Sequence, residues 1–346
     1  MKGHINIPIF IPHLGCPNQC VFCNQRTITG VDSFEPSSVK KIIDTALSTV
    51  DANVEAEIAF FGGSFTGIDY SLMCELLEIA HAYVVDGRVS SIRCSTRPDY
   101  INEKILKTLK RYGVRTVELG LQSCDDGVLS TAKRGHSFED ERRAASLIRE
   151  YGLMLVGQMM IGLPGSTEET ERRTAEFIAD CGAVAARIYP TVVFYGTELC
   201  DMAKQGRYLP LSDEDAVKRT EKVLRIFLQR GVEVIRIGLC ASENLSGASS
   251  YYAGPNHSAL GELVENEYYY NEIKNKILNM YNGDKIHGRI VVSVAKGALS
   301  KAIGQRKRNK LRLSREFSPD VRFTESGKLY GYEISVEEEE RKNKCI

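Results

Sequence analysis

The chain lacks any uninterrupted apolar stretch of the length needed to cross a lipid bilayer, so we expect no membrane span. No signal peptide opens it, and ten cysteines in 346 residues are too few for a disulfide scaffold, so we expect a reducing, cytoplasmic location. The formal net charge is zero, which excludes binding to a polyanion through bulk charge alone. The 43% of hydrophobic residues is nevertheless ample for a folded core.

Three cysteines lie close together near the N-terminus, in the stretch GCPNQCVFCN. Cys16, Cys20 and Cys23 are separated by gaps of three and two residues, with an aromatic residue just before the third cysteine. Three thiolates on one loop can bind three irons of a [4Fe–4S] cube, a cluster that usually takes four cysteine ligands. The fourth iron is then open to an outside ligand. A structural zinc site is the alternative, with His13 or His4 as its fourth ligand.

Strand-like and helix-like segments alternate over the first 240 residues. The strand candidates, rich in β-branched and aromatic residues, are 5–11, 56–61, 91–95, 115–121, 153–161, 184–189 and 232–238. The helical patterns between them are 38–50, 71–85, 102–112, 138–151, 167–181 and 213–230. Repeated strand–helix units predict a parallel sheet with right-handed crossovers. About six units are too few for a closed eight-stranded barrel, so the sequence predicts an α/β fold, an open and partial (β/α)6 TIM-like barrel.

Polar and glycine-rich residues follow the predicted strands, at the edge of the sheet where such barrels carry their chemistry. Gly62 and Gly63 follow the second strand, and glycine lets the backbone approach a ligand closely. Ser95, Thr96 and Arg97 end the third strand and offer two hydroxyls and a guanidinium suited to a ribose and a carboxylate. Each of these runs also fits an ordinary surface turn, so their joint occurrence is what favours a ligand site.

Two polar residues interrupt the apolar fourth strand. Glu118 and Gln122 are an even number of residues apart and therefore point to the same face of a regular strand. If that face is the inner one, we expect both side chains to line the cavity of the barrel.

The cysteine loop resembles the signature of the radical S-adenosylmethionine (SAM) enzymes. In that superfamily SAM chelates the open iron, and one electron from the cube cleaves SAM to methionine and a 5′-deoxyadenosyl radical. The resemblance implies that Cys16, Cys20 and Cys23 bind the cluster and that Gly62 and Gly63 meet the methionine amino group of SAM. It also implies a reducing electron donor as a partner.

Further motifs make this resemblance narrower. The runs FFGGSFT, STRPDY, VELGLQS followed by KRGHS, MMIGLPGST, and RIYPTVVFYGTELCDMAKQGRY recur in this order over residues 5–240. They resemble the radical SAM domain of the catalytic subunit of Elongator, which acts on the wobble uridine of transfer RNA with acetyl-CoA as second substrate. The resemblance implies a [4Fe–4S] cluster, SAM and an RNA substrate, with tRNA as the expected one.

The chain also departs from that relative. Ser95 stands where the relative has an acidic residue, and Arg187 stands where it has lysine. We expect neither the acetyltransferase domain nor the long N-terminal extension of the relative, so the chain is similar to a stand-alone bacterial relative. The acetyl-CoA-dependent step is therefore not carried over.

The remainder of the chain has a different pattern. We expect the barrel domain at 1–240, a connecting segment and helix at 241–283, a small basic α+β module at 284–336 and a charged tail at 337–346. The predicted strand–helix–basic turn–helix–strand order of the module resembles the core of a KH domain, whose GXXG loop clamps four nucleotides of RNA backbone.

The basic turn matches that loop only in part. Gly304 fits the first glycine, but Lys307 stands where the second would be. Seven lysines or arginines and no acid occur from Lys301 to Arg315, and these would contact RNA phosphates. The alternative is a solvated helix face without a ligand.

Three functional hypotheses follow. The leading one is a radical SAM enzyme that modifies RNA. The second keeps the radical chemistry but gives it a small-molecule or protein substrate, as in the coproporphyrinogen dehydrogenases. The third is a non-enzymatic RNA-binding protein with a structural metal at the cysteine loop. The sequence identifies neither the atom attacked nor a catalytic residue.

Overall fold

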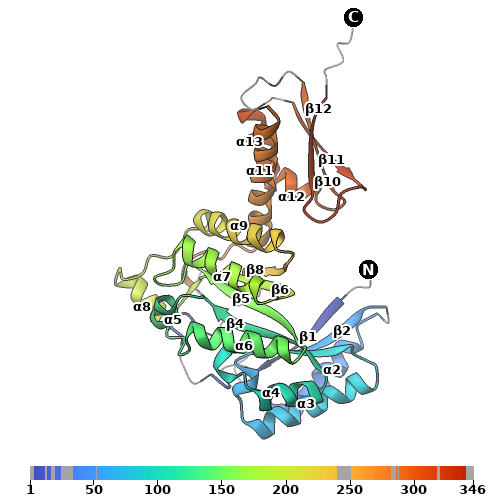
Figure 1. Ribbon diagram of the computed structural model, residues 1–346, viewed down its shortest axis with the longest axis vertical. Helices are drawn as coiled ribbons and strands as arrows, with labels where there is room; N and C mark the ends of the chain where they lie inside the picture. The colour runs from blue at the N-terminus through green and yellow to red at the C-terminus, as the bar shows by residue number, and fades with distance from the viewer. Residues whose placement is uncertain are drawn as a thin grey trace, which may run out of the picture. The chain divides into compact units, whose positions relative to one another are not determined.

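The computed structural model describes residues 4–11, 14–16, 20–24, 34–51, 53–239, 251–281, 286, 288–317 and 320–339. The chain divides into two compact units (Figure 1). The first comprises Met1–Ala216 with Ile226–Ser258, and the second comprises Val217–Arg225 with Ala259–Ile346.

A curled sheet of seven parallel strands forms the centre of the first unit. Across the sheet the strands are β1 (His4–Ile11), β2 (Glu55–Gly62), β3 (Ser91–Thr96), β4 (Val114–Gln122), β5 (Met154–Ile161), β6 (Ala185–Pro190) and β8 (Glu233–Ile237). Over the described residues β1 and β8 are the two edges, so the barrel is open. The predicted partial barrel is confirmed, and each of the seven strand candidates overlaps one of these strands.

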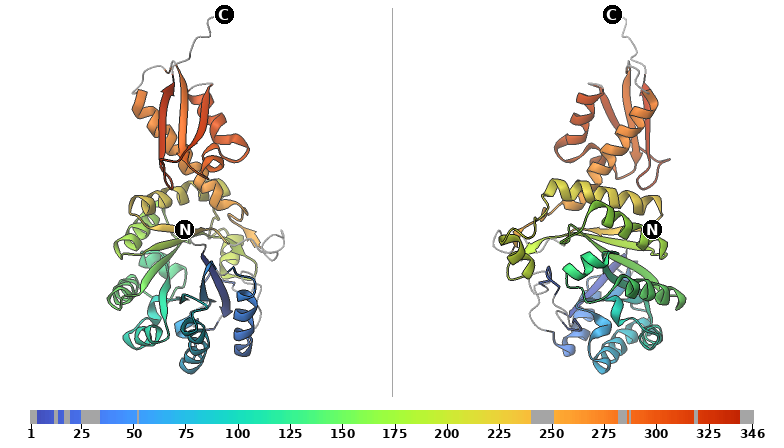
Figure 2. Two further views of the ribbon diagram at one scale, coloured as in Figure 1. Left: turned by 90° about the vertical axis from the view of Figure 1, so that its right-hand side faces the viewer. Right: turned by 60° about the vertical axis from the view of Figure 1, so that its left-hand side comes forward.

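Helices connect the strands, and the longer ones lie on the outer face of the curled sheet (Figure 2). The helices described between the strands, long and short, are α2 (Val39–Leu47), α3 (Tyr70–Val85), α4 (Glu103–Arg111), α5 (Asp126–Thr131), α6 (Phe138–Glu150), α7 (Glu168–Asp180), α8 (Glu198–Lys204) and α9 (Asp213–Gln229). Side chains fix where helices begin: Ser137 with Asp140, and Thr167 with Thr170, form capping boxes at α6 and α7. These caps also fix the lengths of the loops that leave the strand ends. A two-stranded antiparallel ribbon, β7 (Val193–Phe194) with β9 (Tyr251–Ala253), completes the unit.

Apolar residues fill both faces of the central strands. Five consecutive residues of β2, from Ala56 to Phe60, are buried, as expected for a parallel strand covered on both sides. Leu76 and Leu77 of α3 are fully buried on the outer side. Some polar residues of the strands, such as Glu118, Gln122 and Gln158, border cavities on the inner face.

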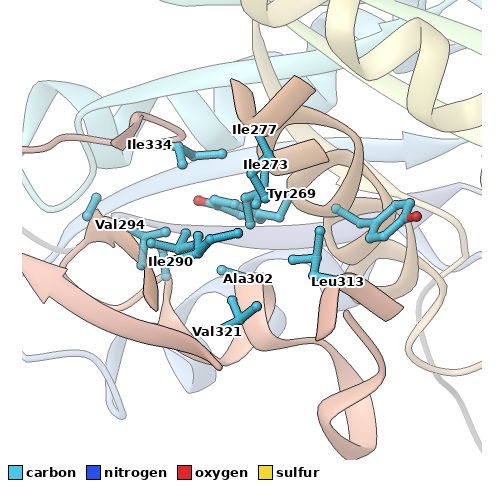
Figure 3. Close-up of a cluster of buried hydrophobic side chains, with 13 residues drawn as sticks. Tyr269, Ile273, Ile277, Ile290, Val294, Ala302, Leu313, Val321 and Ile334 are labelled. Atoms are coloured by element: carbon cyan, nitrogen blue, oxygen red, sulfur yellow. The ribbon is translucent and has the colours of Figure 1, made fainter. Parts of the chain in front are cut away.

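The second unit packs one long helix on a small mixed sheet. Its elements are α11 (Leu260–Tyr281), β10 (Arg289–Ala295), α12 (Leu299–Ile303), α13 (Arg308–Glu316), β11 (Val321–Ser326) and β12 (Ile334–Glu339). The central strand β10 pairs in parallel with β11 and antiparallel with β12. Tyr269, Ile273 and Ile277 of α11 pack in one buried cluster with Ile290 of β10 and Leu313 of α13 (Figure 3).

The domain boundaries expected at residues 240 and 283 fall among residues outside the described ranges, so they stay predictions. At the C-terminal end β12 continues to Glu339, three residues into the expected tail, because Glu337 and its two successors pair with β10. Residues 340–346 lie outside the described ranges. No helix within those ranges combines the length and apolarity needed to span a membrane.

Candidate functional site

A cavity of about 620 Å³ lies where the carboxyl ends of β1 to β5 converge. Nine of the ten residues predicted as site residues border it: Cys16, Cys20, Cys23, Gly62, Gly63, Ser95, Thr96, Arg97 and Gln122. The tenth, Glu118, borders a second cavity of about 430 Å³ instead. The two cavities adjoin, because five residues border both: Phe22, Cys23, Gly62, Ser95 and Gln158.

Backbone hydrogen bonds hold the cysteine loop in place. The N–H of Cys23 donates to the carbonyl of Cys20 at 3.0 Å, and the N–H of Val21 donates to the carbonyl of Ala132 at 3.2 Å. Cys20 is buried, and its Sγ accepts a hydrogen bond from Nη1 of Arg134 at 3.3 Å. The guanidinium of Arg134 therefore fixes the position of this sulfur at the wall of the cavity.

The glycine pair after β2 has a packing role as well as a place in the cavity wall. The N–H of Gly63 donates to the carbonyl of Ile11 at 2.8 Å, which joins the end of β2 to the start of the cysteine loop. A Cβ atom on Gly63 would lie 2.1 Å from the carbonyl oxygen of Leu14, and Gly62 has a φ of +110°. Neither position therefore tolerates a side chain, and the backbone itself borders the cavity.

Arg97 is buried and already bound to an internal carboxylate. Its Nε and Nη2 donate to the two oxygens of Asp99 at 2.9 and 3.1 Å, and Nη2 also donates to the carbonyl of Arg134. Burial opposes its charge, but Asp99 and the thiols of Cys20 and Cys16 outweigh that effect and raise the pKa of Arg97. Its Nη1 is buried and has no hydrogen-bond partner among the described residues. One strong donor therefore remains for an anionic ligand.

The two hydroxyl residues at the end of β3 differ in their surroundings. The hydroxyl of Thr96 lies 2.6 Å from that of Thr66, so it is engaged inside the protein. The half-buried hydroxyl of Ser95 makes no hydrogen bond within the described part of the chain. Ser95 is therefore the freer of the two to meet a ligand.

Gln122 ends β4 at a bulge that the sequence did not reveal. The register of β4 against β5 shifts between Gly120 and Gln122, and Gln122 has a left-handed φ of +75°. Its Oε1 is buried, with no hydrogen-bond partner among the described residues. Glu118 lies four residues before this end of β4 and borders the second cavity, whereas Gly120 and Gln122 border the first.

Glu118 belongs to a chain of buried charges across the inner face of the sheet. Both of its oxygens accept hydrogen bonds from Arg187, at 2.7 and 3.0 Å, and Nη1 of Arg93 donates to it at 3.0 Å. Arg93 also pairs with Glu57 of β2. Burial opposes the charge of Arg187, but Glu118 outweighs it and raises the pKa of Arg187. The guanidinium of Arg187 lies 5.5 Å from the centre of the Phe61 ring, and both residues border the second cavity. Arg187 therefore gives this cavity a cationic side.

Sequence reasoning missed several residues of the site. Arg134 contacts Cys20 and donates to the carbonyl of Gly120 at 2.7 Å, although its run KRGHS is prominent in the sequence. Gln158, a single polar residue in the apolar strand β5, borders both cavities. Only folding brings them to the cysteine loop, so no local signal assigned them a role.

The zinc alternative gains no fourth ligand here. His4 begins β1 whereas the cysteine loop follows its other end, roughly 20 Å away along an eight-residue strand. His13 lies outside the described residues. Within the described ranges no three His, Cys, Asp or Glu side chains are arranged to hold one metal ion. A cluster makes a different demand, because each of its thiolates binds a different iron.

Comparisons with known proteins agree with this geometry. The pattern of the radical SAM superfamily matches residues 10–178, and that of the radical SAM C-terminal domain matches residues 184–270. The tRNA uridine(34) acetyltransferase of Methanocaldococcus jannaschii is 32% identical over 204 residues, which cover 58% of this chain and 36% of that protein. Elongator complex protein 3 of Homo sapiens is 32% identical over 139 residues, which cover 39% of this chain and 25% of that protein.

The fold has a solved counterpart. The Elp3 structure of Methanocaldococcus infernus, with an N-terminal deletion, matches with a TM-score of 0.62 at 24% identity, over 80% of this chain and 64% of that one. The chain spans about a third of the length of the archaeal tRNA uridine(34) acetyltransferases that it matches. From the matching patterns, the strand order and the cysteine loop we conclude that the chain belongs to the radical SAM superfamily of SAM-dependent enzymes.

Proposed function

We propose that Cys16, Cys20 and Cys23 bind a [4Fe–4S] cluster beside a SAM site and that the enzyme modifies a nucleoside of tRNA. The observation that carries the proposal is the 620 Å³ cavity, which brings the three cysteines together with two buried polar groups that have no partner among the described residues. When bound, the cluster and SAM would supply a 5′-deoxyadenosyl radical able to remove an unactivated hydrogen atom.

The residues of the cavity divide the work of holding these groups. Arg134 would stabilise the bound cluster through its hydrogen bond to the sulfur of Cys20. Gly62 and Gly63 would present backbone to the amino group of SAM. Ser95, Arg97 through Nη1, and Gln122 through Oε1 would bind its polar parts. Thr96 would act through Thr66 as a positioning residue, because its hydroxyl is already engaged.

The second cavity supports a substrate site rather than a cofactor site. Phe10, Phe61 and Phe194 give it aromatic walls, and Arg187 adds a fixed guanidinium. RNA bases that leave their stack are typically bound on aromatic rings and arginine planes. We therefore reassign Glu118 from SAM contact to the anchor of Arg187 in this substrate pocket. Relatives named as tRNA uridine(34) acetyltransferases favour tRNA as the substrate.

The cysteines are tested by substitution. Cys16→Ala, Cys20→Ala and Cys23→Ala should each reduce the iron bound after anaerobic reconstitution from about four atoms per chain to less than about one, because three thiolates are the least that hold an open cube. Cys74→Ala is the matched control: this half-buried cysteine lies on α3, away from the cavity, and should leave the iron content unchanged. Full iron content in all three variants would place the cluster elsewhere.

Substrate class is tested by the turnover of SAM. With SAM and a reductant, unmodified tRNA should raise the formation of 5′-deoxyadenosine several-fold, because a bound substrate consumes the radical. The same mass of ribosomal RNA is the control and should have little effect. If tRNA left the formation of 5′-deoxyadenosine unchanged, the result would contradict an RNA substrate and favour a small molecule or a protein.

The substrate pocket is tested at Arg187. Arg187→Gln should lower the tRNA-stimulated turnover by about tenfold or more while tRNA-independent cleavage of SAM stays within about twofold, because Arg187 borders only the second cavity. Glu118 keeps its hydrogen bond from Arg93, so the buried carboxylate is not left without a counter-charge. Arg230→Gln makes the same substitution in an exposed ion pair with Asp180, away from both cavities, and serves as the control. Equal loss of both activities would assign Arg187 to the cofactor site or to the fold.

A further inference from the structure

The basic turn of the second unit is the strongest charged surface that the proposed function does not use. It joins α12 to α13 and belongs to a stretch with seven cations and no acid. Structure separates these cations into two groups. Lys301 and Arg312 pair with Glu265 and Glu267 of α11, at 2.8 and 2.7 Å. These two therefore tie the module together and add little free charge.

The side chains of the other five cations make no ion pair or hydrogen bond within the described part of the chain: Arg306, Lys307, Arg308, Lys310 and Arg315. Four of them are exposed, and Lys310 is half-buried. Arg308, Leu311 and Arg315 are spaced so that they share one face of α13, and all three are exposed. The positive charge is thus concentrated on one turn and on the helix face that follows it.

A buried asparagine fixes the conformation of the turn. Asn309 is buried, and its Nδ2 donates to the carbonyls of Ala302 at 3.1 Å and of Asn266 on α11 at 2.7 Å. A Cβ atom on Gly304, which has a φ of +78°, would lie 3.0 Å from Cγ of Asn309, so the turn closes tightly over that side chain. A ligand of this turn therefore has little backbone to order on binding.

The backbone of the turn places two cations where a side chain is disfavoured. Arg306 and Lys307 have left-handed φ values of 51° and 61°, which glycine or asparagine usually occupy. The N-terminus of α13 has no capping side chain, and its first turn contains no acid. The free charges, the open helix end and the fixed backbone all complement an anion that extends over several positions.

We infer that this turn, Gly304–Arg308, and the adjoining face of α13 bind the phosphate backbone of RNA. The inference rests on the proposed function for RNA as the polyanion, and it concerns affinity rather than chemistry. Because the contacts are to phosphates, binding is expected to depend on salt far more than on nucleotide sequence.

The test uses the reconstituted full-length protein, without SAM or reductant, and a fluorescently labelled unmodified tRNA transcript. A triple variant, Arg306→Gln, Lys307→Gln and Arg308→Gln, should weaken binding about ten- to a hundredfold at 0.1 M salt. The negative slope of log affinity against log salt should become less steep by about 2, as expected for three lost phosphate contacts. A matched triple variant, Lys276→Gln, Arg322→Gln and Lys328→Gln, removes the same charge from exposed positions of the same unit and should bind within about twofold of wild type.

A double variant, Arg306→Lys with Arg308→Lys, distinguishes loss of charge from misfolding. It keeps both charges and should bind tRNA within about threefold of wild type. Loss of binding in this variant, equal loss in both triple variants, or full binding by the turn variant would each overturn the inference. Cleavage of SAM without RNA should be the same in all variants. A protein that binds tRNA through the turn but never responds to tRNA in turnover would refute the proposed substrate and leave this surface standing. If tRNA raised turnover but bound equally well to the turn variant, the proposed substrate would stand and the proposed RNA contact at the turn would be refuted.

Discussion

The contact between the end of β2 and the start of the cysteine loop is the constraint on which the site depends. Gly63 bonds to the carbonyl of Ile11, and a single Cβ atom there would collide with the backbone of Leu14. Because β1 and β2 are parallel neighbours, this contact brings the thiols over the same sheet edge as the polar ends of β3 and β4. Close packing of the backbone at Gly63 thus determines both the shape of the cavity and the position of the cysteines.

Buried charge divides the interior of the barrel into two environments. The series Glu57, Arg93, Glu118 and Arg187 reaches from β2 to β6, across β5, and each member compensates its neighbour. Such a series is costly to bury unless every charge is paired, and it holds Arg187 rigidly beside an aromatic wall. On the cysteine side, Arg97 and Gln122 keep buried polar atoms without partners among the described residues. The paired charges mark the proposed substrate pocket, and the thiols mark the proposed cofactor site.

The sequence predicted the barrel well because strand–helix alternation is local and the strand ends of a parallel sheet must meet. It also predicted nine residues that border one cavity, since each lies at the carboxyl end of a strand or in the loop that follows it. It could not predict the bulge at Gln122, because a bulge depends on pairing with β5. Nor could it predict that Arg97 pairs with Asp99 inside the protein, because that pairing depends on how the loop after β3 folds. It also could not predict that two of the seven cations between Lys301 and Arg315 pair with acids of α11, because these contacts join distant elements.

The central claim is that three cysteines hold a cluster with one iron open to SAM. The most direct measurement is the electron paramagnetic resonance spectrum of the reconstituted, reduced protein, recorded without and with SAM. The account predicts the signal of a single reduced [4Fe–4S] cluster whose shape changes when SAM is added, because SAM becomes a ligand of the open iron. A signal that SAM leaves unchanged, or no cluster signal at all, would contradict it.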